Sequence, residues 1–439
     1  MGSHPHGIAG KISPARGGLR RRAAHLDAHT NDLSRNMKFV SLFSGAGGLD
    51  LGFEAAGWDC VYASDIDATA IDTLRVNKGK HVHGTAMLGH AFIEKADVRE
   101  SSGRDILAKA GIRRGDVSTV VGGPPCQSWS SAGHQLGFED PRGRLFRDYI
   151  RIAGELDVRW LVFENVRGLL TARGPDGKPG SALQHIRETL LKAGFQTGVE
   201  LLNAADFGVA QRRVRLIMIG FRVGDRPVFP SPSHAKAPDL ADDGLSPWVP
   251  LRECLSSITP PTGDEIIRPN VRLEAELSGL RPGTGVRSPG KSEATRPGGH
   301  WGYKQGAFVA DLDLPARTVT ASAQQDWIKD PNLGLRRLCP RECAAIQSFP
   351  PEWVFSGNKA DQYRQIGNAV PPMLAQAVAE SMRAHVSALP KNGAPTKPIK
   401  LLPLHERLEL AIQYTRKEEL RNGPSRRQAP NKRRTRVAA

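Results

Sequence analysis

Residues 38–50 read Lys38-Phe39-Val40-Ser41-Leu42-Phe43-Ser44-Gly45-Ala46-Gly47-Gly48-Leu49-Asp50, an apolar run followed by a glycine turn and an amphipathic segment. The apolar run predicts a buried strand, and the spacing of apolar residues over 49–56 predicts a helix. The same order of β-rich runs and amphipathic segments continues at 60–63, 68–77, 117–121 and 160–163. This alternation predicts an α/β fold built on a mostly parallel, doubly wound sheet.

The glycine turn at 43–48 has the form F-x-G-x-G-G. Glycines let a ligand approach the backbone, and the N-terminus of the next helix offers free N–H groups to an anion. Asp50 stands where a dinucleotide fingerprint has its third glycine, so a pyrophosphate-bearing dinucleotide is disfavoured. Asp65, at the end of the next predicted strand, can accept hydrogen bonds from a ribose diol. The alternative is a tight packing turn.

Two further strand ends carry reactive side chains. The run 117–121 leads through Gly122-Gly123-Pro124-Pro125 into Cys126, a rigid turn that would display a thiol at the carboxyl edge of the sheet. Cys126 is therefore a candidate nucleophile, although many free cysteines are simply small buried hydrophobic residues. Glu164 follows the apolar run 160–163 and would lie at the same edge, unless it is merely a solvated carboxylate.

Two later blocks add polar groups. In Gln211-Arg212-Arg213-Val214-Arg215 an extended backbone would point Arg213 and Arg215 into one space, with surface charge as the alternative. Asn368 lies in a turn that could line a pocket, and a helix is predicted to begin at Pro372. Further strands are expected at 202–207, 214–221 and 316–320, and further helices at 340–348 and 372–384.

Changes in Pro and Gly content, apolar periodicity and charge along the chain predict five regions. These are a basic extension at 1–36, a catalytic and cofactor-binding domain at 37–222, a loop-rich target-recognition region at 223–335, a return segment at 336–388 and a basic tail at 389–439. The net charge is +16, of which 1–36 carry +4 and 391–439 carry +9. Such extensions attract a polyanion through counterion release, or are only solvated, disordered segments.

Composition excludes several classes of protein. The 439 residues include no apolar run of 18 or more, and no secretory signal precedes residue 37, so we expect a cytoplasmic protein without a membrane anchor. The five cysteines are odd in number, and their one close pair has no histidine beside it. Neither a disulfide framework nor a metal site is expected.

The ordered blocks, together with 137–140, 144–146 and 336–343, resemble the DNA cytosine-5 methyltransferase family over about residues 38–385. The resemblance implies a Rossmann-like fold that uses S-adenosylmethionine, releases S-adenosylhomocysteine and carries a smaller target-recognition domain. Asp65 departs from the longer glutamate that is common at its position in the family.

The resemblance also implies roles for the matching residues. Cys126 would attack C6 of a flipped cytosine, and Glu164 would hold the N3 edge of the base. Arg215 would contact O2, while Arg213 would position the Cys126 region or a phosphate. The cofactor pocket would comprise Phe43, Gly45, Gly47, Gly48, Asp65 at the ribose, Ile66 at the adenine, Asp97 at the adenine amino group, Leu145 and Asn368.

The implied substrate is a short sequence of double-stranded DNA, in a bacterial restriction–modification system or as an orphan enzyme. The candidate contacts to DNA are Gln127, Ser130, Arg268, Arg272, Arg281, Arg287, Lys291 and Arg296. We expect a monomer that shares its site with a restriction endonuclease without binding it. Two alternatives are an RNA cytosine-5 methyltransferase and a DNA-binding regulator that has lost its chemistry.

Overall fold

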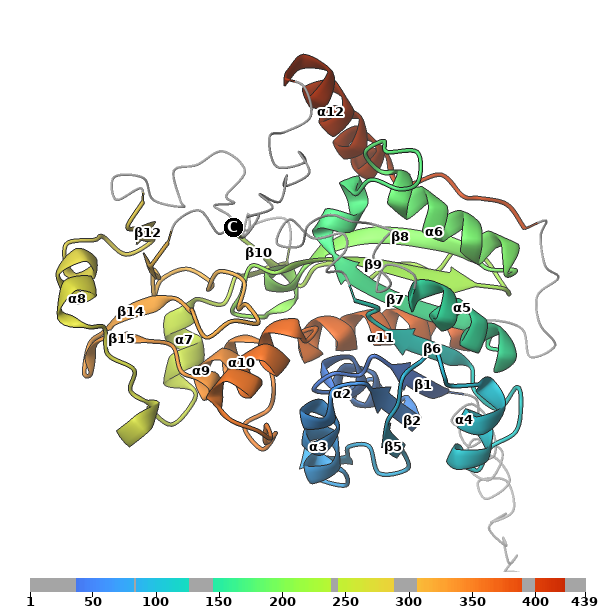
Figure 1. Cartoon of the computed structure of the whole chain (residues 1–439), viewed down its shortest axis with the longest axis horizontal. Coiled ribbons are helices and arrows are strands. Elements are labelled where there is room, and N and C mark those ends of the chain that lie inside the picture. The colour runs from blue at the N-terminus through green and yellow to red at the C-terminus, as the bar shows by residue number, and fades with distance from the viewer. Residues whose placement is uncertain are drawn as a thin grey trace, which may run out of the picture.

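The computed structural model describes residues 37–82, 84–125, 145–237, 244–287, 306–388 and 399–422, and its centre is a seven-stranded sheet (Figure 1). The strand order is β5-β2-β1-β6-β7-β9-β8, and all pairs from β5 to β7 are parallel. Only β9 runs antiparallel, to both β7 and β8, which confirms the predicted mostly parallel sheet. The strands are β1 (Lys38–Leu42), β2 (Asp59–Asp65), β5 (Phe92–Lys95), β6 (Thr119–Gly122), β7 (Trp160–Val166), β8 (Gln196–Asn203) and β9 (Val214–Phe221).

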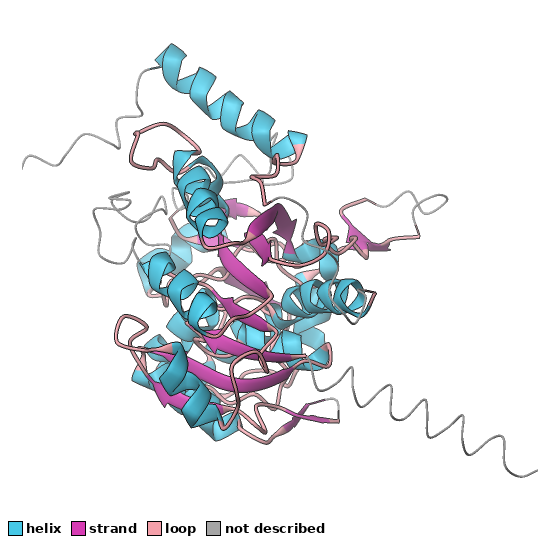
Figure 2. Ribbon diagram, turned by 90° about the vertical axis from the view of Figure 1, so that its right-hand side faces the viewer, coloured by secondary structure: helices cyan, strands magenta, loops and turns pink. Residues whose placement is uncertain are grey.

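Helices cover both faces of this sheet (Figure 2). Successive residues of a strand point to opposite faces, so Phe39 belongs to one buried cluster and Val40 to the other. The first cluster includes side chains of α2 (Gly48–Ala55), α3 (Ala68–Asn77) and α11 (Pro372–Ser387). The second includes side chains of α4 (Gly103–Ala110), α5 (Leu145–Glu155) and α6 (Ser181–Lys192).

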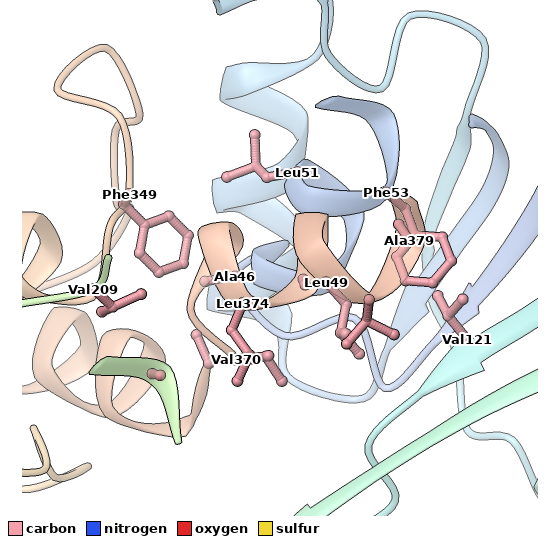
Figure 3. Packing of buried hydrophobic residues seen from close by; sticks show 14 of the residues in the cluster. Ala46, Leu49, Leu51, Phe53, Val121, Val209, Phe349, Val370, Leu374 and Ala379 are labelled. Carbon is pink, nitrogen blue, oxygen red and sulfur yellow. The ribbon is translucent and has the colours of Figure 1, made fainter. Parts of the chain in front are cut away.

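The α11 helix, far along the chain, packs directly against α2. A Cβ atom on Gly52 would lie 2.4 Å from the Cβ of Ala375, so this helix crossing requires a glycine. The Trp58 indole donates to the Ala379 carbonyl at 3.1 Å. Figure 3 shows Leu374 and Ala379 of α11 among Leu49 and Phe53 of α2. The C-terminal segment thereby supplies part of the core beside the glycine turn.

A smaller unit follows β9. Its four-stranded sheet, in the order β12-β13-β14-β15, has a core of its own around Leu277, Val309 and Trp327. Buried Arg336 pairs with both Asp330 and Glu342, which fastens this sheet to α9. The elements are β10 (His234–Ala235), β11 (Ser246–Pro247), α7 (Leu251–Ser256), η5 (Gly263–Glu265), α8 (Val271–Ser278), β12 (Thr284–Gly285), β13 (Phe308–Val309), β14 (Trp327–Asp330), β15 (Gly334–Arg337), α9 (Pro340–Ile346) and α10 (Lys359–Asn368).

Two predicted strands are wrong. Only the start of 202–207 belongs to β8, and Ala204–Phe207 forms the 3₁₀ helix η4. The segment 316–320 makes one isolated bridge, between Gln211 and Ala316. Beyond that bridge the Gln211 side chain accepts the Val319 N–H at 2.9 Å. A side chain thus satisfies a backbone donor that a neighbouring strand would satisfy in a sheet.

Within the range 389–439, expected as a basic tail, residues Glu406–Asn422 form helix α12. Leu408 and Ile412 are buried in the second cluster, and Arg416 donates to the Pro179 carbonyl at 2.9 Å. This helix contacts η3 (Arg167–Thr171), which directly follows β7. A remaining short hairpin pairs β3 (His81–Val82) with β4 (Thr85–Ala86). None of the helices in the described ranges is long and apolar enough to cross a membrane.

Candidate functional site

The glycine turn after β1 has an unusual backbone. Phe43, Gly45 and Gly47 have φ angles of 56°, 53° and 84°, a region that favours glycine and costs energy at Phe43. A Cβ atom on Gly45 would meet no atom within 4 Å, whereas one on Gly48 would lie 2.1 Å from the Val370 carbonyl oxygen. Gly45 therefore faces open space that a ligand can enter, and Gly48 serves close packing.

Asp65, at the carboxyl end of β2, holds this turn. Its Oδ2 accepts the Gly45 N–H at 2.8 Å, and its Oδ1 accepts the Asp67 N–H at 2.9 Å. Burial raises the pKa of the Asp65 carboxyl, because desolvation disfavours the charged form. Ile66 beside it is 60% exposed, an apolar surface next to the turn.

The other three expected cofactor residues lie on separate elements. Asp97 follows β5 and pairs with Arg99, whose guanidinium lowers the pKa of the Asp97 carboxyl. Leu145 is half-buried at the start of α5. Asn368 is exposed at the end of α10, two residues before the Val370 carbonyl that packs on Gly48.

A buried ion pair stands at the same sheet edge. The Arg215 Nε lies 2.9 Å from Glu164 Oε1, and each side chain is only 11% exposed. Because β9 runs antiparallel to β7, its first residues meet the end of β7, where Val166 pairs with Arg215. Burial raises the pKa of the Glu164 carboxyl, and the positive charges of Arg215 and Arg213 oppose that rise.

The turn that leads to Cys126 touches this pair. A Cβ atom on Gly123 would lie 2.8 Å from Glu164 Oε2, and the Asn165 amide donates to the Pro124 carbonyl at 3.2 Å. Cys126 itself, with Gln127 and Ser130, falls in 126–144, outside the described residues. Gly123 and Pro124 thus lie against Glu164 and Asn165, shortly before the candidate nucleophile in the sequence.

Arg213 has different partners from Arg215. Its side chain is fully buried and donates to the carbonyls of Val319, Gly367 and Ala369 at 2.9, 2.6 and 2.9 Å. The two guanidinium groups were expected to point into one space. Arg213 donates to three backbone carbonyls of distant segments, whereas Arg215 donates to the neighbouring Val214 carbonyl and pairs with Glu164. The positive charges of both arginines nevertheless act on Glu164. Alternation along an extended segment fixes the face of a side chain, and neighbouring segments decide what it binds.

The candidate DNA contacts that the structure describes lie in the smaller unit that follows β9. Arg268 donates to the carbonyls of Leu333 and Leu335, so it holds the turn between β14 and β15. Arg272 lies on α8, 3.6 Å from Glu276. Arg281 and Arg287 are exposed, and Lys291 and Arg296 lie outside the described residues. The described ranges contain no group of three or more side chains that could hold a metal ion.

A family model of C-5 cytosine-specific DNA methylases matches residues 37–384. The chain belongs to this family. It is 33% identical over 350 residues to the type II methyltransferase M1.HphI of Haemophilus parahaemolyticus, covering 79% of this chain and 87% of the relative. It is 32% identical over 365 residues to M.FnuDI of Fusobacterium nucleatum, covering 79% and 94%. As a member of the family, the protein methylates cytosine at C5 in DNA, and the family implies the use of S-adenosylmethionine.

Solved structures show the same fold. A putative DNA modification methyltransferase of an E. coli prophage is 21% identical, with a TM-score of 0.55 over 80% of this chain and 99% of that chain. A DNMT2 protein of Spodoptera frugiperda is 18% identical, with a TM-score of 0.54 over 79% and 99%. These likenesses establish that the methylase has the fold of methyltransferases.

Proposed function

We propose that this methylase transfers the methyl group of S-adenosylmethionine to C5 of a flipped cytosine, within a short sequence of double-stranded DNA. The observation that carries the proposal is the buried Glu164–Arg215 pair, which lies against the turn 123–125 at the carboxyl edge of the sheet. An open α/β sheet binds its ligands at this edge. The pair and the thiol that follows the turn supply the groups that cytosine activation requires.

The glycine turn fits the cofactor, because Gly45 faces open space in which a ligand can approach the backbone without meeting a Cβ atom. In the proposed pocket Asp65 fixes the turn and faces the ribose, Ile66 covers the adenine, and Asp97 accepts from its amino group. Phe43, Gly47, Gly48, Leu145 and Asn368 complete the walls. The bound cofactor supplies an electrophilic methyl group on a sulfonium.

Cys126 starts the reaction in this proposal. Its thiolate adds to C6 of the cytosine, which makes C5 nucleophilic, and C5 then takes the methyl group. A water accepts the C5 proton, and elimination breaks the bond between Sγ and C6 to release the thiolate. The base must leave the helical stack to reach the sheet edge, so the proposal includes base flipping.

Glu164 and Arg215 stabilise the adduct. Electron density moves toward N3 when the thiolate adds, and a protonated Glu164 can donate to N3 at that moment. The raised pKa of Glu164 favours this protonated form at a pH where a solvated glutamate is ionised. Arg215, held by Glu164, is placed to contact O2 of the base.

The region 223–335 is the proposed target-recognition domain, between a catalytic domain at 37–222 and a return segment at 336–388. We propose that its basic side chains, with Gln127 and Ser130, contact phosphates or guanines. Arg268 binds two carbonyls, and the exposed Arg272, Arg281 and Arg287 are further candidates among the described residues. We further propose a cytoplasmic enzyme that acts as a monomer without metal, and whose cognate endonuclease reads the same site without binding it.

Bisulfite sequencing tests the proposal. DNA is taken from a host without cytosine methylation that expresses the wild-type enzyme, its Cys126→Ser variant, or Cys254→Ser as a matched control. Cys254 suits this purpose because burial raises the pKa of its thiol to about 12. We expect cytosines of one short motif to resist bisulfite conversion with the wild type and with Cys254→Ser, but not with Cys126→Ser. Full protection by Cys126→Ser would refute the covalent mechanism, and protection absent from DNA but present in RNA would refute the substrate.

A further inference from the structure

Arg213 is a buried charge that donates to backbone carbonyls of distant segments. A buried guanidinium is costly unless its donors are satisfied, and here it donates to Val319 on one segment and to Gly367 and Ala369 on another. Its planar fork can reach several acceptors at fixed angles. The side chain therefore ties the entry of β9 to two segments more than 100 residues away.

Two glutamines repeat this connection. The Gln211 amide donates to the Gln347 side chain at 2.7 Å and accepts the Val319 N–H at 2.9 Å. The Gln347 amide donates to the carbonyls of Ile366 and Ala369 at 2.7 and 3.2 Å. All three side chains are buried, so the segments at 211–213, 319 and 366–369 form one polar junction.

The turn at 366–370 is clamped from both sides. A Cβ atom on Gly367 would lie 2.1 Å from the Thr320 carbonyl carbon, so no side chain fits between the two segments. On the other side, the Val370 carbonyl packs on Gly48 of the glycine turn. Figure 3 shows Val370 close to Ala46 of that turn. Between these contacts stands Asn368, the proposed wall of the cofactor pocket.

From this arrangement we propose that Arg213 is a positioning residue for the cofactor pocket: it fixes the turn that carries Asn368 against the glycine turn, and it contacts neither the base nor a phosphate. The proposal rests on the assignment of that pocket to S-adenosylmethionine. It gives two neighbouring arginines different roles, because Arg213 would position the cofactor pocket and Arg215 would contact the base.

Arg213→Lys is the direct test, because a lysine keeps the charge but cannot reach three carbonyls with one planar group. Binding of S-adenosylmethionine is measured by calorimetry without DNA, and turnover is measured with DNA. We expect binding to weaken about tenfold or more, with KM for the cofactor raised and kcat changed little. Gln347→Ala should shift the affinity in the same direction.

Two variants serve as controls. Arg215→Lys should lower kcat and leave cofactor binding as in the wild type. Arg187→Lys is a control for the loss of a buried guanidinium group as such. Arg187 is buried and donates to Thr197 and to the Leu402 carbonyl, neither of which belongs to the proposed pocket. This variant should lower the melting temperature without changing cofactor affinity.

Three outcomes would overturn the proposal. Arg213→Lys could bind the cofactor normally and lose kcat as Arg215→Lys does, which would place Arg213 at the base. Arg187→Lys could weaken cofactor binding as much as Arg213→Lys, which would reduce the role of Arg213 to general stability. Failure of the wild-type enzyme itself to bind S-adenosylmethionine would refute the pocket assignment and, with it, this inference.

Discussion

At the scale of single residues, the site depends on carboxylates whose surroundings differ. Glu164 is paired with Arg215 and buried, while Asp65 accepts two backbone N–H groups and holds a turn. Burial raises the pKa of both, but only Glu164 stands beside the turn that leads to the thiol. A buried carboxyl group is thus a candidate acid in one place and a structural acceptor in the other.

Replacing Glu164 with glutamine tests its role as an acid. The amide keeps the size of the side chain but cannot release a proton to N3, so kcat should fall by about 10²-fold or more. Single-turnover methylation with the enzyme in excess over DNA measures the chemical step, steady-state assays give kcat, and calorimetry should show unchanged affinity for S-adenosylmethionine. An unaltered kcat would show that Glu164 transfers no proton.

Asp50 predicts a pH dependence of stability. It is fully buried on α2, and desolvation raises the pKa of its carboxyl to about 7. Between about pH 4 and pH 7 the folded chain therefore holds a proton that the unfolded chain has lost. The free energy of unfolding should fall as pH rises through this window, and Glu54, with a pKa of about 8, extends the fall.

The variant Asp50→Asn should remove the contribution of Asp50. The free energy of unfolding of Asp50→Asn minus that of the wild type should be roughly 1–3 kcal/mol larger at pH 8 than at pH 5, because only the wild type loses stability over this range. Urea titrations at the two pH values measure the difference. Asp72→Asn, at an exposed position on α3, should show no such change. A pH-independent difference for Asp50→Asn would mean that Asp50 is ionised in the folded enzyme.

At the scale of elements, α12 is an addition to the core beyond the family match, which ends at residue 384. Its buried side is formed by Leu408 and Ile412, while Leu410 on the same helix is 54% exposed. The helix packs on η3 and on the loop near Gly180, where a Cβ would lie 2.7 Å from Ile412. The segment that follows β7 is therefore covered by the C-terminal part of the chain.

Ile412→Ala should destabilise the enzyme by about 2–4 kcal/mol, because it leaves a cavity against η3. Leu410→Ala is the matched control, and its effect should stay within about 0.5 kcal/mol. Denaturant titration compares the two variants. Equal effects would show that α12 is detached from the core in solution.

At the scale of the whole molecule, positive charge is concentrated toward the ends of the sequence. Residues 1–36 carry +4, and residues 423–439, beyond α12, contain six Lys or Arg and no Asp or Glu. In contrast, α12 itself has four basic and four acidic residues, so its charge is balanced. The helix belongs to the packed molecule, and the excess positive charge lies in the flanking segments.

Deleting 1–36 and 423–439 together, with α12 retained, should weaken DNA binding and flatten its dependence on salt. Each lost phosphate contact reduces the slope of log K against log[salt] by about 0.9. Fluorescence anisotropy at several salt concentrations measures the slope, and bisulfite sequencing should recover the same methylated motif. A changed motif would show that the extensions read sequence.

The sequence by itself determined the parallel sheet and the positions at which its strands end, because both follow from local periodicity and from glycine and proline turns. It placed Asp65 and Glu164 at one edge, since the carboxyl ends of parallel strands meet there. Only the tertiary structure assigned Arg213 to the turn at 366–370, showed that 316–320 is not a strand, and revealed α12. Each of these depends on contacts between segments more than 100 residues apart, and local pattern carries no signal of which distant segment supplies the partner.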